Sequence, residues 1–427
     1  MTLMLDIKFI RENKELVQQA ALDKNFKVDL DSLLSLDEQL RGMQSQLEEL
    51  QNQRNSKSKL IAKASPEERE ELKSQVAALK PRMEELQGQV RDLQEKHHNL
   101  MLDVPAPARE DVPVGKDDAE NVQVKTWGEP PKFSFKIKDH MELGELNDWI
   151  DTPRGVKLAG SRSYVLKGDA ARLESALLKF TLDHLYNKGY QQLSVPVLVK
   201  EDCMVGTGYF PKGRDQAYYI EEDKLALVGT AEVPVASFHS DEMLKEADLP
   251  IRYMAQSSCF RREAGTYGKD THGLYRVHQF QKVEQVIIAK ADKAQSEELH
   301  NELLNNSEEI MQKLELPYQV VYVCTGDLGQ GQVRKHDIET WMPSREAYSE
   351  THSCSTFHDF QARRLKIRYK DSDKKKHICY TLNNTAIATP RVLIPFLEMH
   401  QQEDGSVRIP EALRPYLNGQ EFIGGKK

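Results

Sequence analysis

The sequence has few cysteines, and they are not arranged as a disulfide framework or a metal site. Its five cysteines are scattered over 427 residues, and no two stand as Cys-x-x-Cys. The odd number and the wide spacing exclude a readable disulfide pattern or a cysteine zinc knuckle and indicate a reducing compartment. The histidines show no metal-ligand spacing either, so we expect no zinc.

Long apolar runs are also missing. No stretch approaches the ~18 consecutive apolar residues of a membrane-spanning helix. The start of the chain, MTLMLDIKFIREN, is interrupted by Asp6, Lys8 and Arg11, which is not typical of a signal peptide. We therefore expect a cytoplasmic protein with no membrane contact.

An excess of positive charge is absent as well. The formal net charge is −8, so any nucleic acid must meet a local basic surface. No Gly-x-x-x-x-Gly-Lys-Ser/Thr loop occurs, which excludes that type of phosphate cradle. No nucleophile elbow supports Ser–His–Asp catalysis. With 39% hydrophobic and 30% charged residues, the composition fits a globular enzyme of two or three domains that carries one long polar helical element.

A helical repeat dominates residues 30–100. Apolar residues step by three and four, first through Leu33, Leu36, Leu40, Met43, Leu47 and Leu50, and then through Leu72, Val76, Leu79, Met83, Leu86, Val90, Leu93 and Leu100. Such a narrow seam predicts two antiparallel helices that stabilise each other. Ser65, Pro66 and Glu68 predict the start of the second helix through an N-cap, a first-turn proline and a capping box. Pro81 predicts a kink in that helix.

The distal half of this hairpin is relatively basic, through Arg54, Lys57, Lys59, Lys63, Lys73, Lys80, Arg82 and Arg91. These residues suit either a solvated helix surface or an arm that touches a nucleic-acid backbone. We assign residues 1–103 to this arm domain.

A stretch rich in Pro, Asp and Glu follows at residues 104–132 and reads as a linker. Residues 133–427 mix strand-like runs with helical segments near 168–189, 294–314 and 391–401, which predicts an α+β domain with an antiparallel sheet flanked by helices. The run 190–200 suits a strand, and Pro196 within it favours an edge or interface position.

Charged residues on a probable hairpin form the first candidate site. The run 258–263 (SCFRRE) faces the run 273–284 (GLYRVHQFQKVE) across a polar, Gly-rich stretch. Strand alternation predicts that Arg276, Phe280 and Glu284 share a face with Arg261 and Glu263 of the other arm. Such a face can hold a polyanion, stack a flat ring and read an amine or hydroxyl, although two Arg and two Glu also occur as surface ion pairs.

Three further groups carry candidate chemistry. In Gly229-Thr230-Ala231-Glu232, alternation along a strand lets Thr230 and Glu232 bind an ammonium group. In the run 350–355 (ETHSCS), Glu350 and Ser353 can hold Mg²⁺ among phosphate oxygens, but only if a bulge brings them to one face. In the run 381–391 (TLNNTAIATPR), Asn383 and Thr385 share a face and Arg391 opens a helix. The helix dipole disfavours a cation at that end, so this arginine favours a bound anion there.

Taken together and in order, the motifs resemble bacterial-type seryl-tRNA synthetase, a class II aminoacyl-tRNA synthetase, over essentially the whole chain. They are GTAEVP (229–234), FRREAG (260–265), VHQFQKVE (277–284), ETHSCS (350–355), FQARR (360–364) and NNTAIATPR (383–391). The long hairpin resembles the family's tRNA-binding arm, and the region of Gly189 and Pro196 resembles the class II dimer motif.

The resemblance implies a homodimer that activates L-serine with ATP and transfers it to serine tRNA; whether selenocysteine tRNA is also served stays open. It implies catalytic roles for Arg261, Glu263 and Arg391, and Mg²⁺ ligands in Glu350 and Ser353. It implies an ATP site of Arg261, Arg262, Glu263, Arg276, Val277, Phe280, Glu350, Thr351, His352, Ser353 and Arg391. The implied serine site is Thr230, Ala231, Glu232, Arg261, Glu284, Asn383 and Thr385.

Two other interpretations compete with this one. The first is a ligase that loads an amino acid onto a carrier protein, but truncated relatives of that kind lack the long arm that this chain keeps. The second is a non-catalytic scaffold with a relic synthetase domain, against which the intact Arg261, Glu263, Glu350 and Arg391 argue.

Overall fold

A computed structural model describes residues 5–266, 268 and 272–425. The chain divides into two compact units, one ending at Pro105 and the other beginning at Ala106. Within the described ranges, no helix combines the length and the apolar character that crossing a membrane requires.

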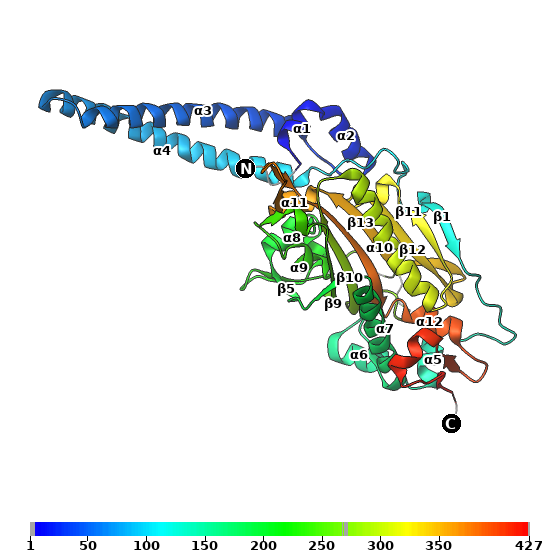
Figure 1. Ribbon diagram of the computed structural model, residues 1–427. Helices are drawn as coiled ribbons and strands as arrows, with labels where there is room; N and C mark the ends of the chain where they lie inside the picture. Colours follow the sequence, from blue (N-terminus) through cyan, green and yellow to red (C-terminus); the bar gives the residue numbers. More distant parts are fainter. Residues whose placement is uncertain (1–4, 267, 269–271, 426–427) are drawn as a thin grey trace. The chain divides into compact units, whose positions relative to one another are not determined.

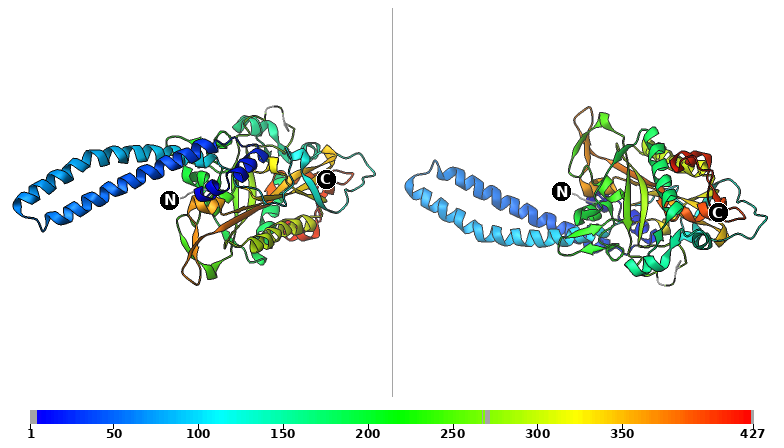
Figure 2. Two further views of the ribbon diagram at one scale, coloured as in Figure 1. Left: turned by 90° about the horizontal axis from the view of Figure 1, so that it is seen from above. Right: turned by 90° about the horizontal axis from the view of Figure 1, so that it is seen from below.

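The first unit is a helical hairpin preceded by two short helices. Helices α1 (Ile7–Glu12) and α2 (Lys14–Asp23) lead into α3 (Leu30–Ile61) and α4 (Pro66–Asp103), which run side by side along the hairpin (Figure 2). The predicted start of α4 is confirmed: Ser65 is the N-cap, Pro66 opens the helix and Glu68 completes the capping box.

The apolar seam lies between the two long helices. Leu33 and Leu40 of α3 and Met83, Leu86 and Val90 of α4 are buried. Helix α4 continues through Pro81, so the missing backbone donor does not end it. Packing along the seam therefore outweighs the local cost of the proline.

An eight-stranded sheet forms the centre of the second unit, in the order β1-β11-β12-β13-β16-β10-β9-β4. All pairs are antiparallel except β4 with β9. The strands are β1 (Val122–Trp127), β4 (Gln191–Leu193), β9 (Ile251–Phe260), β10 (Gln279–Ala289), β11 (Tyr318–Tyr322), β12 (Arg334–Met342), β13 (Ala347–His358) and β16 (Tyr380–Thr389).

Helices cover both faces of this sheet. Figure 1 shows α7 (Gly168–Asn187) and α10 (Lys293–Lys313) lying across one face, where they pack on Met254 and Ile287. The strand neighbours Tyr253 and Val286 point the other way, toward α9 (Glu232–Ala236) and α11 (Phe360–Leu365). The predicted α+β class with a flanked antiparallel sheet is confirmed.

Two details differ from the sequence-based expectation. The stretch 104–132 is not only a linker, because β1 within it pairs with β11 along its length; its Pro- and Asp-rich surroundings hide the short alternating run. The run 190–200 is two strands, β4 and β5 (Leu198–Lys200), separated around Pro196, and β4 is the edge strand of the large sheet.

Smaller elements complete the unit. They include the helices α5 (His140–Leu146), α6 (Thr152–Ala159), α8 (Glu201–Thr207) and α12 (Leu393–His400). Small sheets pair β2 (Ile150–Asp151) with β3 (Val165–Leu166), and β17 (Ser406–Arg408) with β18 (Phe422–Gly424). Two further small sheets consist of β5, β7 (Leu225–Leu227) and β6 (Tyr219–Ile220), and of β15 (Lys376–Ile378), β14 (Arg368–Lys370) and β8 (Met243–Lys245).

Candidate active site

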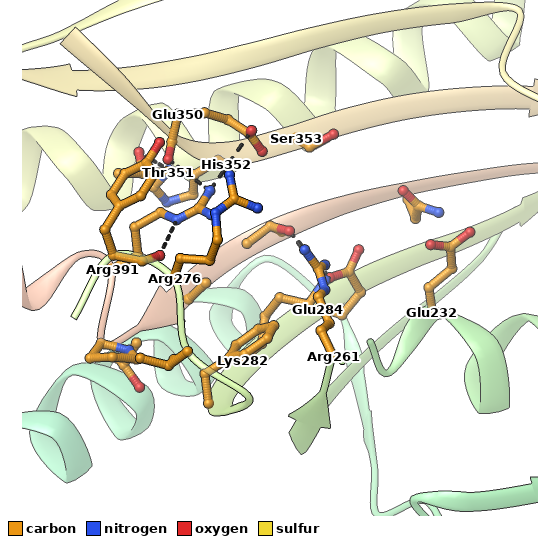
Figure 3. A pocket seen from close by; sticks show the side chains of 18 of the residues that line it. Glu232, Arg261, Arg276, Lys282, Glu284, Glu350, Thr351, His352, Ser353 and Arg391 are labelled. Atoms are coloured by element: carbon orange, nitrogen blue, oxygen red, sulfur yellow. Dashed lines mark hydrogen bonds and ion pairs between the residues drawn. The ribbon is translucent and has the colours of Figure 1, made fainter. Parts of the chain in front are cut away.

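One cavity of about 140 Å³ brings the candidate residues together on the sheet. Arg261 and Arg391 lie 130 positions apart in the sequence, yet both line it. Figure 3 shows Arg276, Arg391 and Glu350 gathered at one end and Glu232 at the other, with Arg261 and Glu284 between them. The cavity therefore offers cations along its length and carboxylates at both ends.

Some of the residues predicted on the 258–284 hairpin lie on its strands, and others lie on the segment between the strands. Strand β9 ends at Phe260 and β10 begins at Gln279, so Arg261, Glu263 and Arg276 belong to the connecting segment. The prediction that strand alternation places Arg276 is therefore wrong, although Phe280 and Glu284 do share a face of β10. Arg276 donates to the Glu263 carboxylate over 2.8 Å, and the Arg261 guanidinium lies 5.2 Å from the centre of the Phe280 ring.

Arg391 follows β16 and turns toward β13. Its guanidinium donates to the backbone oxygen of Glu350 over 3.0 Å and lies 3.8 Å from the Glu350 carboxylate. Loss of hydration would raise the pKa of Glu350, but the charges of Arg391 and Lys335 outweigh it and lower that pKa. Glu350 is therefore an anion that faces the cavity.

A bulge in β13 brings Glu350 and Ser353 to the same cavity. His352 pairs with Ile338 and Glu350 with Glu339, so Thr351 is the extra residue. The sequence-based requirement for a bulge here is confirmed, and Glu350, Thr351, His352 and Ser353 all line the cavity. His352 is buried, which lowers its pKa to about 4 and keeps the ring neutral.

Glu232 is held by two neutral donors at its end of the cavity. Tyr209 Oη donates to one carboxylate oxygen over 2.8 Å and Gln361 Nε2 to the other over 2.7 Å. Burial and the charge of Glu284 raise the pKa of Glu232 to about 7. Glu232 opens α9 instead of lying on a strand, so the predicted strand face shared with Thr230 is wrong; the Thr230 hydroxyl accepts the backbone N–H of Glu232.

Lys282 and Glu284 form a buried ion pair beside it on β10. The Lys282 ammonium also donates to the Thr385 hydroxyl over 3.3 Å. Thr385 and Asn383 come from β16, the neighbour of β10 in the sheet. This part of the cavity is a small polar chamber, in which the Thr385 hydroxyl also donates to the Glu284 carboxylate over 3.4 Å.

Most of the predicted site residues line the cavity, and three do not. Arg262, Thr230 and Ala231 are not among its lining residues: Thr230 and Ala231 are buried beneath it, and the backbone of Arg262 bonds to Gln216 outside it. Sequence reasoning missed Lys282 and Tyr209. Alternation with Phe280 and Glu284 could have found Lys282, whereas no local pattern points to Tyr209.

The protein oxygens in the cavity could bind a hard cation such as Mg²⁺ only if oxygens of a bound substrate or water complete its coordination. Among the described residues, no group of three or more His, Cys, Asp or Glu side chains could hold a metal ion. The Glu350 carboxylate and the Ser353 hydroxyl are oxygen donors that suit Mg²⁺, and phosphate or water oxygens would have to complete its coordination.

Comparison with known proteins covers both units. Residues 4–107 match the seryl-tRNA synthetase N-terminal domain, and residues 218–400 match the tRNA synthetase class II core domain (G, H, P, S and T). A serine--tRNA ligase of Deinococcus radiodurans is 47% identical over 99% of both chains.

Solved structures agree. Seryl-tRNA synthetase from Pyrococcus horikoshii, complexed with ATP, superposes with a TM-score of 0.90 at 38% identity and covers 99% of this chain and 100% of that one. Cytoplasmic serine-tRNA ligase from Naegleria fowleri, in complex with AMP, gives 0.86 at 30% identity and covers 100% of both. With its arm, its class II sheet and its polar cavity, this chain belongs to the seryl-tRNA synthetase family.

Proposed function

We propose that the cavity carries out both steps of the family's reaction, in which the chain activates L-serine with ATP and transfers it to tRNA. In the first step a serine carboxylate oxygen attacks the α-phosphorus, an O–P bond forms, and the bond to the β-phosphate breaks to release pyrophosphate. In the second step a hydroxyl of the 3′-terminal adenosine attacks the seryl carbonyl and AMP leaves. The convergence of Arg261 and Arg391 on one cavity carries this proposal.

The end with three charged side chains suits ATP. Arg276 and Arg391 can neutralise the distal phosphates, and Arg261 can bridge the α-phosphate and the serine carboxylate with its fork of donors. Phe280 and Arg391 would hold the adenine ring between them, and Glu263 would accept from its amino group. Because Glu263 is paired with Arg276, this assignment requires the pair to open or to share the carboxylate.

The chamber at the other end suits serine. Glu232 and Glu284 provide negative charge for the ammonium group, and Thr385 and Glu284 can bond the hydroxyl. No side-chain nucleophile is needed, because positioning and charge stabilisation supply the catalysis of such a displacement. Thr230 and Ala231, which were predicted as serine ligands, are buried next to Glu232, and Thr230 accepts the backbone N–H of Glu232, so we assign them to the support of that carboxylate.

The ATP end of the cavity also carries oxygen donors that would suit Mg²⁺. Glu350 and Ser353 would hold it, and the ion would neutralise charge that develops on the phosphate oxygens. Arg391 already lies near Glu350, so the guanidinium and the cation would share the same carboxylate.

Three parts of the proposal concern the setting of the enzyme. We assign the helical arm to tRNA recognition, and the reaction to the cytoplasm, where ATP and tRNA are present. We also propose a homodimer formed around the end of α7 and the following strands β4 and β5, where Tyr186 of α7 and Leu198 of β5 are exposed apolar residues. Sedimentation of the purified chain at twice its monomer mass would support the dimer, and a monomer would contradict it.

Exchange of labelled pyrophosphate into ATP tests the function most directly. The assay is run with a panel of amino acids that includes serine, threonine, alanine and glycine. Serine alone should support rapid exchange, and charging of serine tRNA should follow. Exchange with a different amino acid and not with serine would overturn the assignment of the chamber.

A further inference from the structure

A fully buried carboxylate lies outside the cavity and none of the assigned roles uses it. Glu398 of α12 accepts four hydrogen bonds: from the backbone N–H (3.1 Å) and Nδ1 (2.7 Å) of His140, and from the backbone N–H (2.9 Å) and Oγ (2.7 Å) of Ser344. Within the described part of the chain, no lysine or arginine pairs with it. Such a carboxylate is costly to bury, and its donors come from two segments far apart in the sequence.

The first donor segment is the start of α5, which packs beside α12 in Figure 1. It also contacts the segment that connects β9 to β10. His140 Nε2 accepts the backbone N–H of Leu274 over 3.3 Å. Because Nε2 accepts, the ring proton lies on Nδ1 and is donated to Glu398. Glu398 thus fixes the tautomer and the orientation of His140, and His140 in turn fixes the backbone at Leu274.

Gly273 makes this approach possible. Its φ is +71°, and a Cβ atom at this position would lie 2.0 Å from His140 Nε2. A side chain at residue 273 would therefore push the ring away. Gly265, in the same segment, has φ +79° but no atom near its Cβ position. The two glycines share the same backbone strain and differ in the contact with His140.

Both segments meet at Tyr275. Leu274 precedes it directly, and Arg345, the neighbour of Ser344, lies with its guanidinium 4.2 Å from the centre of the Tyr275 ring. The guanidinium of Arg391 lies 4.4 Å from the same ring, and Arg391 Nε lies 3.4 Å from the Tyr275 backbone oxygen. Tyr275 is thus an aromatic platform for Arg391, of a kind that cation–π attraction stabilises.

We propose that Glu398 and His140 are positioning residues for ATP: through Leu274 and Ser344 they hold Tyr275, and Tyr275 holds Arg391 in its place in the cavity. This inference rests on the assignment of Arg391 to ATP. It predicts that substitutions which disturb the contact between Glu398 and His140 raise KM for ATP and leave KM for serine nearly unchanged.

Gly273→Ala and Gly265→Ala form the matched test. Serine-dependent pyrophosphate exchange gives KM for ATP and KM for serine, and a melting curve with and without ATP gives stability and binding separately. For Gly273→Ala we expect KM for ATP to rise about tenfold relative to Gly265→Ala, about 1.4 kcal/mol of binding. KM for serine should change less than about twofold, and the ATP-induced rise in Tm should shrink in parallel.

Three further variants separate positioning from folding. Glu398→Gln should behave like Gly273→Ala, because its amide would oppose donors that a carboxylate accepts. Tyr275→Leu should also raise KM for ATP. Tyr275→Phe keeps the aromatic ring, so its KM for ATP should stay close to that of the unaltered protein. The inference is overturned if Gly273→Ala matches Gly265→Ala, or if the variants lower Tm without changing KM for ATP. Absence of serine-dependent exchange in the unaltered protein would instead contradict the proposed function.

Discussion

Tyr209 and Glu232 are joined by a hydrogen bond of 2.8 Å in which the tyrosine hydroxyl donates to the carboxylate. Gln361 donates to the other carboxylate oxygen, and Thr381 donates to the Gln361 side-chain oxygen, so a chain of neutral groups holds Glu232 in place. Glu284 adds negative charge nearby and Lys282 adds positive charge. Glu232 therefore depends on hydrogen bonds to stay ionised in a buried site.

The first prediction concerns the pH dependence of serine use. The pKa of Glu232 is about 7, so the carboxylate is ionised above that pH and protonated below it. Because an ammonium group prefers the ionised form, kcat/KM for serine should fall as the pH drops below about 7. Tyr209→Phe removes a donor to the charged form and should move this fall to higher pH. The profile for ATP serves as the control; an unchanged serine profile in Tyr209→Phe would contradict the role of Tyr209.

The second prediction concerns the buried pair of Lys282 and Glu284. Lys282→Met leaves Glu284 without its cation and should lower the free energy of unfolding by about 3 kcal/mol. It should also raise KM for serine more than KM for ATP, since Lys282 contacts Thr385 in the serine chamber. Urea denaturation and the exchange assay measure the two effects.

Lys188→Met is the matched control for that pair. Lys188 lies 2.6 Å from Glu309, and both side chains are about 40% exposed. A solvated pair of this kind should cost less than about 1 kcal/mol to break. Equal losses for Lys188→Met and Lys282→Met would show that burial does not distinguish the two pairs.

The third prediction concerns selectivity between serine and alanine. The Thr385 hydroxyl donates to Glu284 Oε2 over 3.4 Å, and both groups would form hydrogen bonds with the substrate hydroxyl. Alanine lacks that hydroxyl and would leave buried polar groups unpaired. Sites of this kind reject the analogue by roughly 10⁴-fold. Thr385→Val should lower the ratio of exchange with serine to exchange with alanine by about tenfold. Thr181→Val makes the same chemical change inside α7 and should leave the ratio as it is; a fall there would mean that selectivity follows general destabilisation.

Local patterns were enough to predict the arm and many of the residues that line the cavity. The seam of α3 and α4 and the capping box at Ser65 follow from spacing alone, and the bulge at Thr351 follows from the need to bring Glu350 and Ser353 together. The assignment of Arg276 to a strand failed because the strand pattern gives way to loop before Gln279. Periodicity cannot show where pairing stops when polar residues continue the alternation.

The groups that sequence reasoning missed are held by contacts that no local pattern records. Tyr209 reaches Glu232 from the segment after α8, and Glu398 reaches His140 across 258 positions. The short alternating run of β1 was hidden by prolines and acidic residues around it. In each case the tertiary partner, and not the residue's immediate neighbours, defines its role.

The last prediction concerns the arm. Its helices converge where Asp37 Oδ1 and His97 Nε2 lie 3.9 Å apart, so residues 41–93 can be replaced by a short glycine turn that leaves this contact in place. The catalytic unit begins at Ala106 and has its own core, so serine-dependent exchange should stay within about twofold of the full chain. Charging of serine tRNA should be lost, because the basic distal half of the arm is removed. If exchange disappears together with charging, the arm supports the catalytic unit itself; if charging survives, tRNA is recognised elsewhere on the chain.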